Sequence, residues 1–220
     1  MTTPLIDATE MYLKTIWELE EEGITPIRAR LVERLHLSAP AVSETVSRLE
    51  QDGLVRITSD RRLELTERGR SLAVGVMRKH RLVERLLTDV LNLDLEHVHT
   101  EACRWEHVIS DRVEQRLAGL LSDPATDPYG NPIPGRDDAV PRSALVTLLE
   151  AAKDGAHATV KRYSERLQND VEFMTRVREA DVGPETEVDA GLETGHVVAR
   201  TGDVVFRLTA EEAELVYVSV

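Results

Sequence analysis

The chain has 220 residues, a formal net charge of −13 at pH 7 and 41% hydrophobic residues, so one large domain or two to three small domains can each bury a core. No apolar run approaches the roughly 20 residues that a membrane span needs, and residues 1–9 lack the pattern of a signal peptide. The single cysteine excludes an intramolecular disulfide. These features predict a cytoplasmic protein without a membrane partner.

The charge is unevenly distributed along the chain. Residues 26–86 hold thirteen Arg and Lys against eight Asp and Glu, a local net charge of +5, whereas residues 1–25 hold Lys14 as their only base against six acids. Arginine dominates the basic stretch, and its planar guanidinium suits contacts to phosphate and guanine. A basic segment in an acidic chain indicates a DNA-contacting module.

Three helices and a hairpin are expected within this first part. The first helix covers residues 9–22 and ends at Gly23, and a short second helix covers residues 27–35. The third begins after Ser38, a good N-cap, and ends at Gly53. Residues 54–57 and 63–65 then favour two short strands. This order is typical of a winged helix-turn-helix.

The third helix is expected to read DNA, because its outward side chains are small or polar and can enter a major groove. Winged folds that mediate protein contacts are the alternative, and the arginines of the hairpin favour DNA. The residues expected near base edges are Ser38, Pro40, Ala41, Ser43 and Glu44. The residues expected at phosphates are Arg28, Arg48, Arg61 and Arg62.

Three more helices follow, expected at residues 66–91, 94–109 and 111–121. They carry more apolar positions than a small winged domain needs. A dimerisation surface explains this excess, and a self-contained helical bundle is the alternative. From residue 122 to residue 135, closely spaced Pro and Gly predict a semi-rigid linker that approaches a domain boundary.

The last part is expected to be a small, strongly turned domain. Residues 144–152 and 164–179 favour helices, whereas residues 158–160, 197–198, 204–206 and 215–220 favour strands. Glycines between the later apolar runs indicate tight turns. The fold class is therefore mainly α with a small β domain.

The pentad Cys103–His107 is the strongest candidate for chemistry. On a helix, Cys103, Glu106 and His107 share a face, so a thiolate, a carboxylate and an imidazole can converge on one divalent transition metal. Taken alone, a lone Cys is more often a buried hydrophobe and a Glu-His pair is more often solvated.

Further candidate ligands lie outside the pentad. His80 and Glu84 are one helical turn apart, and His99 lies one turn before Cys103. Met11 stands on the first helix among polar neighbours. A second pair one turn apart, Glu165 and Gln168, lies in the last domain. Surface hydrogen bonds for the His-Glu pair and a core position for Met11 are the simpler alternatives.

Four sequence blocks resemble the iron-dependent regulators of the diphtheria-toxin-repressor type, in the same order and over nearly the whole chain. They are Thr9–Leu13, Met77–Leu82, Glu101–His107 and Gly130–Gly135. The resemblance is weakest in the last domain. It implies a winged helix-turn-helix at residues 1–73, a helical dimerisation and metal-binding domain with the Pro-rich linker at 74–142, and an SH3-like domain at 143–220.

The resemblance also implies two metal sites and a function. The regulatory site would use Met11, Cys103, Glu106 and His107. The ancillary site would use His80, Glu84, His99, Glu165 and Gln168. The two sulfurs favour Fe²⁺, since the manganese-sensing branch has carboxylates in their place, with Co²⁺, Ni²⁺, Mn²⁺ or Zn²⁺ as substitutes.

The implied protein is a homodimeric repressor of iron-homeostasis genes that binds a palindromic operator when metal-loaded, with one or two dimers per operator left open. Glu44 departs from the family pattern, which has Gln there, and this puts the operator preference in doubt. One rival is a metalloenzyme, which needs an open coordination position and a placed general base, but the sequence has neither a recognisable catalytic motif nor a nucleophile elbow, and a thioether ligand suits hydrolysis poorly. The other rival is a manganese or zinc sensor of the same build. The last domain could also be a mere spacer.

Overall fold

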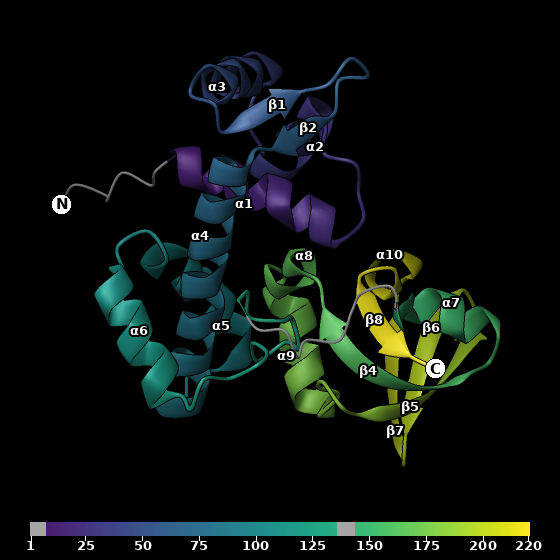
Figure 1. The fold of residues 1–220 in the computed structure, drawn as a ribbon. Coiled ribbons are helices and arrows are strands. Elements are labelled where there is room, and N and C mark those ends of the chain that lie inside the picture. The colour runs from purple at the N-terminus through teal and green to yellow at the C-terminus, as the bar shows by residue number, and fades with distance from the viewer. Residues whose placement is uncertain (1–7, 136–143) are drawn as a thin grey trace. The chain divides into compact units, whose positions relative to one another are not determined.

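The structure is a computed structural model that describes residues 8–135 and 144–220. These residues form two compact units, which we call unit 1 and unit 2 (Figure 1). Unit 1 runs to His80 and also includes Glu106–Ile109. Unit 2 consists of Arg81–Trp105 and Ser110–Val220. Among the described helices, none is long and apolar enough to cross a membrane.

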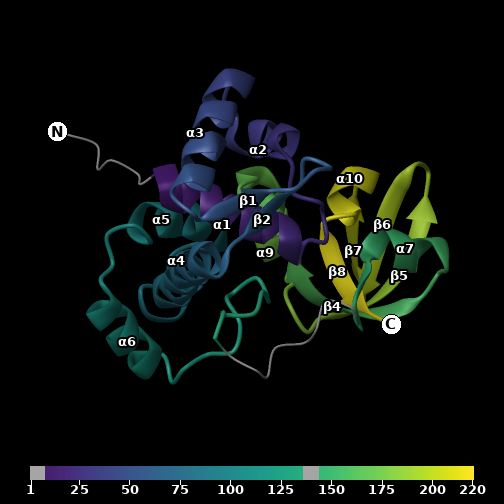
Figure 2. The same ribbon diagram turned by 45° about the horizontal axis from the view of Figure 1, so that its top comes forward.

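Unit 1 is built from helices around one core, with a two-stranded sheet. Its elements are α1 (Ala8–Glu21), α2 (Arg28–Leu35), α3 (Ala39–Gln51), β1 (Val55–Ile57), β2 (Leu63–Leu65) and the greater part of α4 (Glu67–Arg85). The apolar stripes of α1 and α3 supply fully buried side chains, among them Leu13, Ile16 and Val46. Figure 2 shows α2 and α3 lying side by side.

The helix-turn-helix and the wing are confirmed by local geometry. The Ser38 hydroxyl accepts a hydrogen bond from the Ala41 amide and caps α3. Gly53 follows α3 with a φ of +70°, a conformation that glycine adopts without strain. The strands β1 and β2 then pair antiparallel, with Arg56 opposite Glu64.

Two helices end earlier than the sequence predicts. The helix expected at 66–91 is α4, which gives way to one π-helical turn, η1 (Leu86–Val90). The helix expected at 94–109 is α5 (Leu95–Trp105), and residues 106–108 form a turn. The pentad therefore does not present a single helical face, because Glu106 and His107 lie beyond the helix. This expectation was wrong.

Unit 2 combines helices with an antiparallel sheet. Its remaining elements are α6 (Asp111–Leu120), β3 (Val146–Thr147), α7 (Leu148–Lys153), β4 (His157–Tyr163), α8 (Glu165–Gln168), α9 (Val171–Ala180), β5 (Glu187–Glu193), β6 (His196–Thr201), β7 (Val204–Leu208), α10 (Ala210–Ala213) and β8 (Val216–Ser219). The six strands lie in the order β3-β8-β4-β5-β6-β7. The ring of Phe173 packs edge-on against Tyr163 and Phe206, with centroids 5.9 Å away in each case.

The sequence pattern misses two strands and merges two helices in unit 2. Strand β3 lies within the helix expected at 144–152, which begins only at Leu148. Strand β5 escapes the pattern because only Val188 and Ala190 turn a buried side chain inwards between acidic residues. The helix expected at 164–179 is broken between α8 and α9. There the Asp170 side chain accepts from the Phe173 amide and starts a new helix.

The Pro-rich segment has no helix, as expected, but it is packed into unit 2 and is not an open tether. Tyr129 and Ile133 are buried, and the Tyr163 amide donates to the Tyr129 carbonyl at 3.0 Å. Gly130 has a φ of +89°, and a Cβ there would lie 1.9 Å from the Lys161 carbonyl oxygen. The backbone can approach β4 this closely only because residue 130 has no side chain.

The three-domain division stays a prediction. The expected boundary at 142/143 falls outside the described residues, and the boundary at 73/74 falls within α4.

Candidate functional site

Five ionisable side chains meet inside unit 1, and we call them the unit 1 cluster. Helix α1 provides Glu10 and Lys14, α4 provides His80, and the turn after α5 provides Glu106 and His107. Three of them are deeply buried, with exposed fractions of 6% for Lys14, 0% for His80 and 4% for Glu106. Charged groups are seldom this buried unless they are paired.

Glu106 is at the centre of the unit 1 cluster. Its Oε2 lies 2.8 Å from Lys14 Nζ and 2.5 Å from His80 Nδ1, and its Oε1 lies 3.2 Å from His107 Nε2. Burial alone would raise the pKa of Glu106. The ammonium of Lys14 and then the imidazole of His80 outweigh it, and the pKa lies well below its usual value. Glu106 is therefore an anion that holds nitrogen donors on both oxygens.

His107 connects the turn to α1. Its Nδ1 lies 2.7 Å from Glu10 Oε2, on the side opposite its contact with Glu106. The hydrogen bond with Glu106 raises the pKa of His107, burial opposes this, and Glu10 raises it further. The pair of carboxylates around one imidazole is a donor set that a divalent cation can use.

The four predicted regulatory ligands belong to different units. Met11, Glu106 and His107 are part of unit 1, whereas Cys103 is part of unit 2. Met11 is half-buried and packs against the apolar core of unit 1. The ligand set therefore stays a prediction.

A second group of ligand atoms lies within unit 2. Glu84 of α4, His99 of α5 and Glu165 of α8 each offer one oxygen or nitrogen, all within 4.8 Å of one another, and all three residues are buried. His99 Nδ1 lies 3.1 Å from Glu84 Oε1 and 3.4 Å from Glu165 Oε2. We call these three residues, together with Gln168, which was predicted for the same site, the unit 2 cluster. His80, predicted for the same site, precedes Glu84 by one turn of α4.

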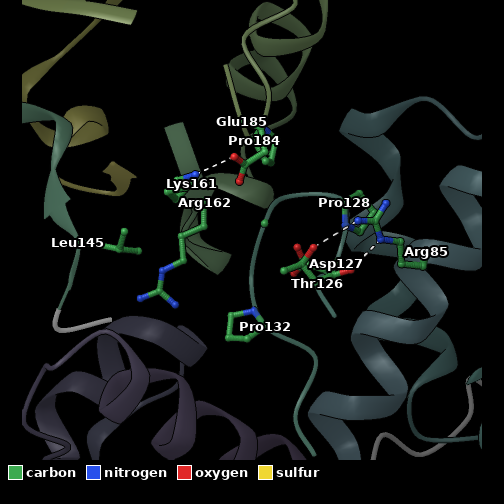
Figure 3. A pocket seen from close by; sticks show the side chains of 11 residues that line it. Arg85, Thr126, Asp127, Pro128, Pro132, Leu145, Lys161, Arg162, Pro184 and Glu185 are labelled. Carbon is green, nitrogen blue, oxygen red and sulfur yellow. Dashed lines mark hydrogen bonds and ion pairs between the residues drawn. The ribbon is translucent and has the colours of Figure 1, made fainter. Parts of the chain in front are cut away.

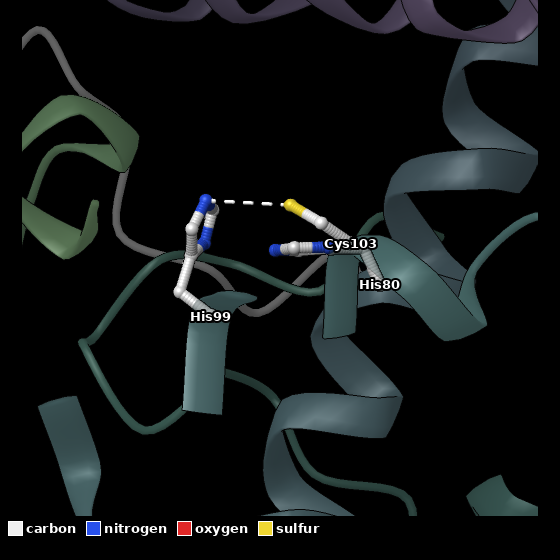
Figure 4. A group of neighbouring side chains, drawn as sticks. All are labelled: His80, His99 and Cys103. Atoms are coloured by element: carbon white, nitrogen blue, oxygen red, sulfur yellow. Dashed lines mark hydrogen bonds between the residues drawn. The ribbon is translucent and has the colours of Figure 1, made fainter. Parts of the chain in front are cut away.

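His99 also contacts the thiol of the pentad. Its Nε2 lies 3.5 Å from Cys103 Sγ, and Figure 4 shows the ring and the thiol facing each other. Both ring nitrogens of His99 are thus within reach of predicted metal ligands.

The environment of Gln168 indicates whether unit 2 suits a metal. The side chain is fully buried, and its Nε2 donates to the Tyr163 carbonyl at 3.0 Å. Its Oε1 is buried and has no hydrogen-bond partner among the residues that the structure describes. A buried amide oxygen without a donor costs free energy, which a bound cation would recover. Two carboxylates, an imidazole and this oxygen suit a divalent transition metal.

A buried arginine balances the acids of unit 2. Arg81 has an exposed fraction of 0% and donates to Glu165 Oε1 at 3.0 Å. It also lies 3.6 Å from Asp127 Oδ2. Burial raises the pKa of Asp127 well above its usual value, and Glu84 raises it further against the opposing charge of Arg81. The acids beside Glu84 and His99 thus share one fixed cation, Arg81.

The predicted DNA-reading residues lie on the outer face of the helix-turn-helix. Pro40, Ala41, Glu44 and Arg48 are exposed on α3, and Ser43 is half-exposed. A shallow groove of about 350 Å³ follows this face between Glu44 and Gln51. Arg28 is half-exposed on α2, and Arg61 and Arg62 are exposed in the turn of the wing, where Arg62 pairs with Asp60 at 2.7 Å.

Unit 2 also contains a cavity of about 320 Å³ beside the Pro-rich segment (Figure 3). Its cations already contact groups of the chain. Arg85 donates to the Thr126 carbonyl at 2.7 Å, Lys161 pairs with Glu185 at 2.7 Å, and the Arg162 guanidinium lies 4.6 Å from the centre of the Tyr217 ring. We assign no ligand to it.

Sequence reasoning missed two members of the unit 1 cluster, Glu10 and Lys14. It also missed the buried pair beside the unit 2 cluster, Arg81 and Asp127. Lys14 did leave a signal, since it is the only base among the first 25 residues. Glu10 and Arg81 lie within the sequence blocks that resemble the family, next to the predicted ligands Met11 and His80. Asp127 gave no signal among the turn residues around it.

Comparison with known proteins identifies the family. Residues 4–63 match the profile described as "Iron dependent repressor, N-terminal DNA binding domain". Residues 66–135 match the profile "Iron dependent repressor, metal binding and dimerisation domain".

Curated relatives and a solved structure indicate the same family. The chain is 53% identical to the iron-dependent repressor IdeR of Mycobacterium tuberculosis over 203 residues, which are 87% of this chain and 86% of that protein. It is 49% identical to the diphtheria toxin repressor of Corynebacterium diphtheriae over 201 residues, 88% of each. A manganese-dependent transcriptional repressor in complex with manganese has a TM-score of 0.83 at 30% identity, covering 96% of this chain and 99% of that one.

Both profiles together cover more than half of the chain, and the relatives are about half identical over most of its length. The chain therefore belongs to the iron-dependent repressor family, whose members are transcriptional regulators and not enzymes.

Proposed function

We propose that this chain is an Fe²⁺-activated, homodimeric repressor that binds palindromic operator DNA of iron-homeostasis genes in the cytoplasm. The observation that carries the proposal is the pair of buried donor clusters, because five of their members lie in the segment that matches the metal-binding and dimerisation profile of the family, namely His80, Glu84, His99, Glu106 and His107. The named iron-dependent relatives support iron as the signal.

The regulatory site is proposed to use Met11, Cys103, Glu106 and His107. Two sulfur donors beside nitrogen and oxygen favour a late divalent ion such as Fe²⁺ over Mg²⁺ or Ca²⁺. Support comes from Glu106, which is buried and anionic beside His107. A manganese-sensing protein of the same build is the second candidate, because a solved neighbour of high structural similarity is a complex with manganese.

The ancillary site is proposed to use His80, Glu84, His99, Glu165 and Gln168. Its support is the convergence of Glu84, His99 and Glu165 and the buried Gln168 oxygen that has no donor among the described residues. Because α8 belongs to the last domain of the predicted division, an occupied site would make that domain more than a spacer.

The proposed switch between weak and tight operator binding depends on which parts of the chain supply the metal ligands. A bound divalent ion supplies the positive charge that holds sulfur, nitrogen and oxygen donors together. Since the proposed regulatory ligands come from both units, sharing one ion restricts the arrangements that the units can adopt. Binding that favours one conformer raises its population. The favoured conformer is proposed to space the two α3 helices of a dimer for successive major grooves.

The dimer is supported by apolar surface on helices of the dimerisation profile. Val113 and Leu120 of α6 are 46% and 64% exposed, and Trp105 at the end of α5 is 37% exposed. Contiguous apolar surface marks protein interfaces, and we propose that these three side chains lie in the dimer interface. Ser38, Pro40, Ala41, Ser43 and Glu44 are proposed to face bases, with Arg28, Arg48, Arg61 and Arg62 at phosphates.

Two substitutions test the ligand set. Met11→Leu keeps the volume that Met11 fills beside the unit 1 core, and Cys103→Ser removes the sulfur. We expect each variant to need at least about tenfold more Fe²⁺ for operator binding, measured anaerobically by fluorescence anisotropy. The dimer mass by sedimentation should be unchanged. Wild-type activation of both variants at the wild-type Fe²⁺ concentration would overturn the ligand set.

A further inference from the structure

Lys14 brings a positive charge into the interior of unit 1. The residue has an exposed fraction of 6%, and its Nζ lies 2.8 Å from Glu106 Oε2 and 3.2 Å from His80 Nδ1. It stands on α1 one helical turn after Glu10 and Met11, so its stem follows the same face of the helix. An ammonium group is costly to bury, and its contact with the Glu106 carboxylate offsets that cost.

The position of the ammonium resembles that of a bound cation. It lies against the carboxylate that is the best-supported ligand of the proposed regulatory site, and it neutralises the charge that would attract a divalent ion. Glu106 cannot give its Oε2 fully to a metal while Lys14 and His80 remain at 2.8 Å and 2.5 Å. Two cations close together in a buried site also repel each other strongly.

We propose that Lys14 is an internal competitor of the metal, whose ammonium holds Glu106 in the metal-free protein and thereby lowers the metal affinity of the site. This inference rests on the proposed role of Glu106 as a metal ligand. Lys14 thereby sets the metal concentration at which the switch responds.

The chemistry of lysine and its neighbours suits such a role. The ammonium is a compact point charge on a flexible stem of four carbons, so it can leave one carboxylate for another without movement of the backbone. Glu18 offers an alternative acceptor, since its Oε1 lies 3.8 Å from Lys14 Nζ one turn further along α1. Lys14 can therefore turn towards Glu18 and still remain paired when Glu106 binds a cation.

The competition predicts opposite effects on metal binding and on the metal-free fold. Removing the ammonium frees Glu106 for a metal and removes the repulsion, so affinity should rise. The same change leaves a buried carboxylate without its cation, so the metal-free protein should lose thermal stability. A residue that merely supports the fold would lower both quantities.

The test uses the full-length chain with Mn²⁺ as an air-stable probe, whose free concentration is measured by electron paramagnetic resonance. Lys14→Met keeps the length of the side chain and removes the charge. We expect it to bind Mn²⁺ at least about tenfold more tightly than the wild type and to melt at a lower temperature without metal. Lys14→Arg retains the charge and serves as the control, with an affinity within about threefold of wild type.

Two further variants make the result decisive. Lys14→Gln can still donate to Glu106 and should also bind Mn²⁺ more tightly than wild type, which keeps the test valid if Lys14→Met does not fold. In the double variant Lys14→Met/Glu106→Gln the gain should disappear, because the gain acts through Glu106.

Unchanged or weaker Mn²⁺ binding by folded Lys14→Met or Lys14→Gln, beside normal binding by the wild type, would overturn the role of Lys14 alone. Failure of the wild type to bind Mn²⁺, Fe²⁺ or Zn²⁺ would instead overturn the proposed function, and this inference with it.

Discussion

Replacing Gly130 by alanine should destabilise unit 2 selectively, because the Pro-rich segment depends on the missing side chain. The residue has a φ of +89°, and a Cβ would lie 1.9 Å from the Lys161 carbonyl oxygen and 3.1 Å from the Arg162 Cα. Both neighbours are backbone atoms of β4, which cannot turn away as a side chain would. The segment itself must therefore move outwards.

The cost of that movement can be estimated from the contacts it breaks. The left-handed conformation costs alanine about 1 kcal/mol relative to glycine. Outward movement stretches the bonds from the Tyr163 amide to Tyr129 and from Asn131 Nδ2 to Tyr163, both 3.0 Å long, at about 1 kcal/mol each. The expected loss is therefore about 3 kcal/mol, a large share of the stability of a domain.

Gly155 provides a matched control in the same unit. It has a φ of +61°, and a Cβ there would meet no atom within 4 Å. Gly155→Ala should therefore cost only the conformational part, about 1 kcal/mol. Urea unfolding gives both free energies, and hydrogen exchange of the β4 and β8 amides shows whether the loss lies in unit 2. Equal losses in the two variants would refute the argument from close approach.

Two other predictions concern charge and ligands in unit 2. The Arg178 guanidinium lowers the pKa of Glu96 by hydrogen bonding, against the effect of burial. Glu96→Gln should therefore reduce the free energy of unfolding by about 1 kcal/mol at pH 7, a small loss because Arg178 is partly exposed to solvent. A carboxyl with a lowered pKa stabilises the fold above its unfolded pKa and loses this effect as the pH falls through the folded pKa. The difference in unfolding free energy between the wild type and Glu96→Gln, measured in urea, should therefore shrink below about pH 4. A difference that stays constant with pH would contradict the pairing. Gln168→Leu should weaken Mn²⁺ binding to the unit 2 cluster about tenfold in calorimetry, and it should change the free energy of unfolding by less than about 1 kcal/mol. Unchanged Mn²⁺ binding would exclude Gln168 from the ligands.

Local signals made the first unit largely predictable from sequence. Ser38 before a periodic apolar stripe and Gly53 after it mark the ends of α3 within a residue or two, because capping and left-handed glycine are short-range effects. The sequence blocks that resemble the family then identified five of the candidate ligands, namely Met11, His80, Cys103, Glu106 and His107.

Long-range packing explains what the sequence did not show. The helix of the pentad was expected to reach Ile109, but residues after Trp105 turn so that Glu106 and His107 contact α1 and α4, and no local rule encodes those contacts. Lys14 and Arg81 were missed as buried cations because a single charged residue in a helix is usually solvated. Only their acidic neighbours in space justify their burial.

The central claim is that iron switches the chain between weak and tight operator binding. The most direct measurement is an anaerobic anisotropy titration of an operator fragment, selected from random DNA by the Fe²⁺-loaded chain, with Fe²⁺, Mn²⁺, Zn²⁺ or a chelator present. Tight binding should appear at the lowest free concentration of Fe²⁺, and the chelated protein should bind only as weakly as to unrelated DNA. Equal affinity with and without metal would contradict the account, and activation by Mn²⁺ or Zn²⁺ at lower free concentrations than Fe²⁺ would contradict the choice of iron.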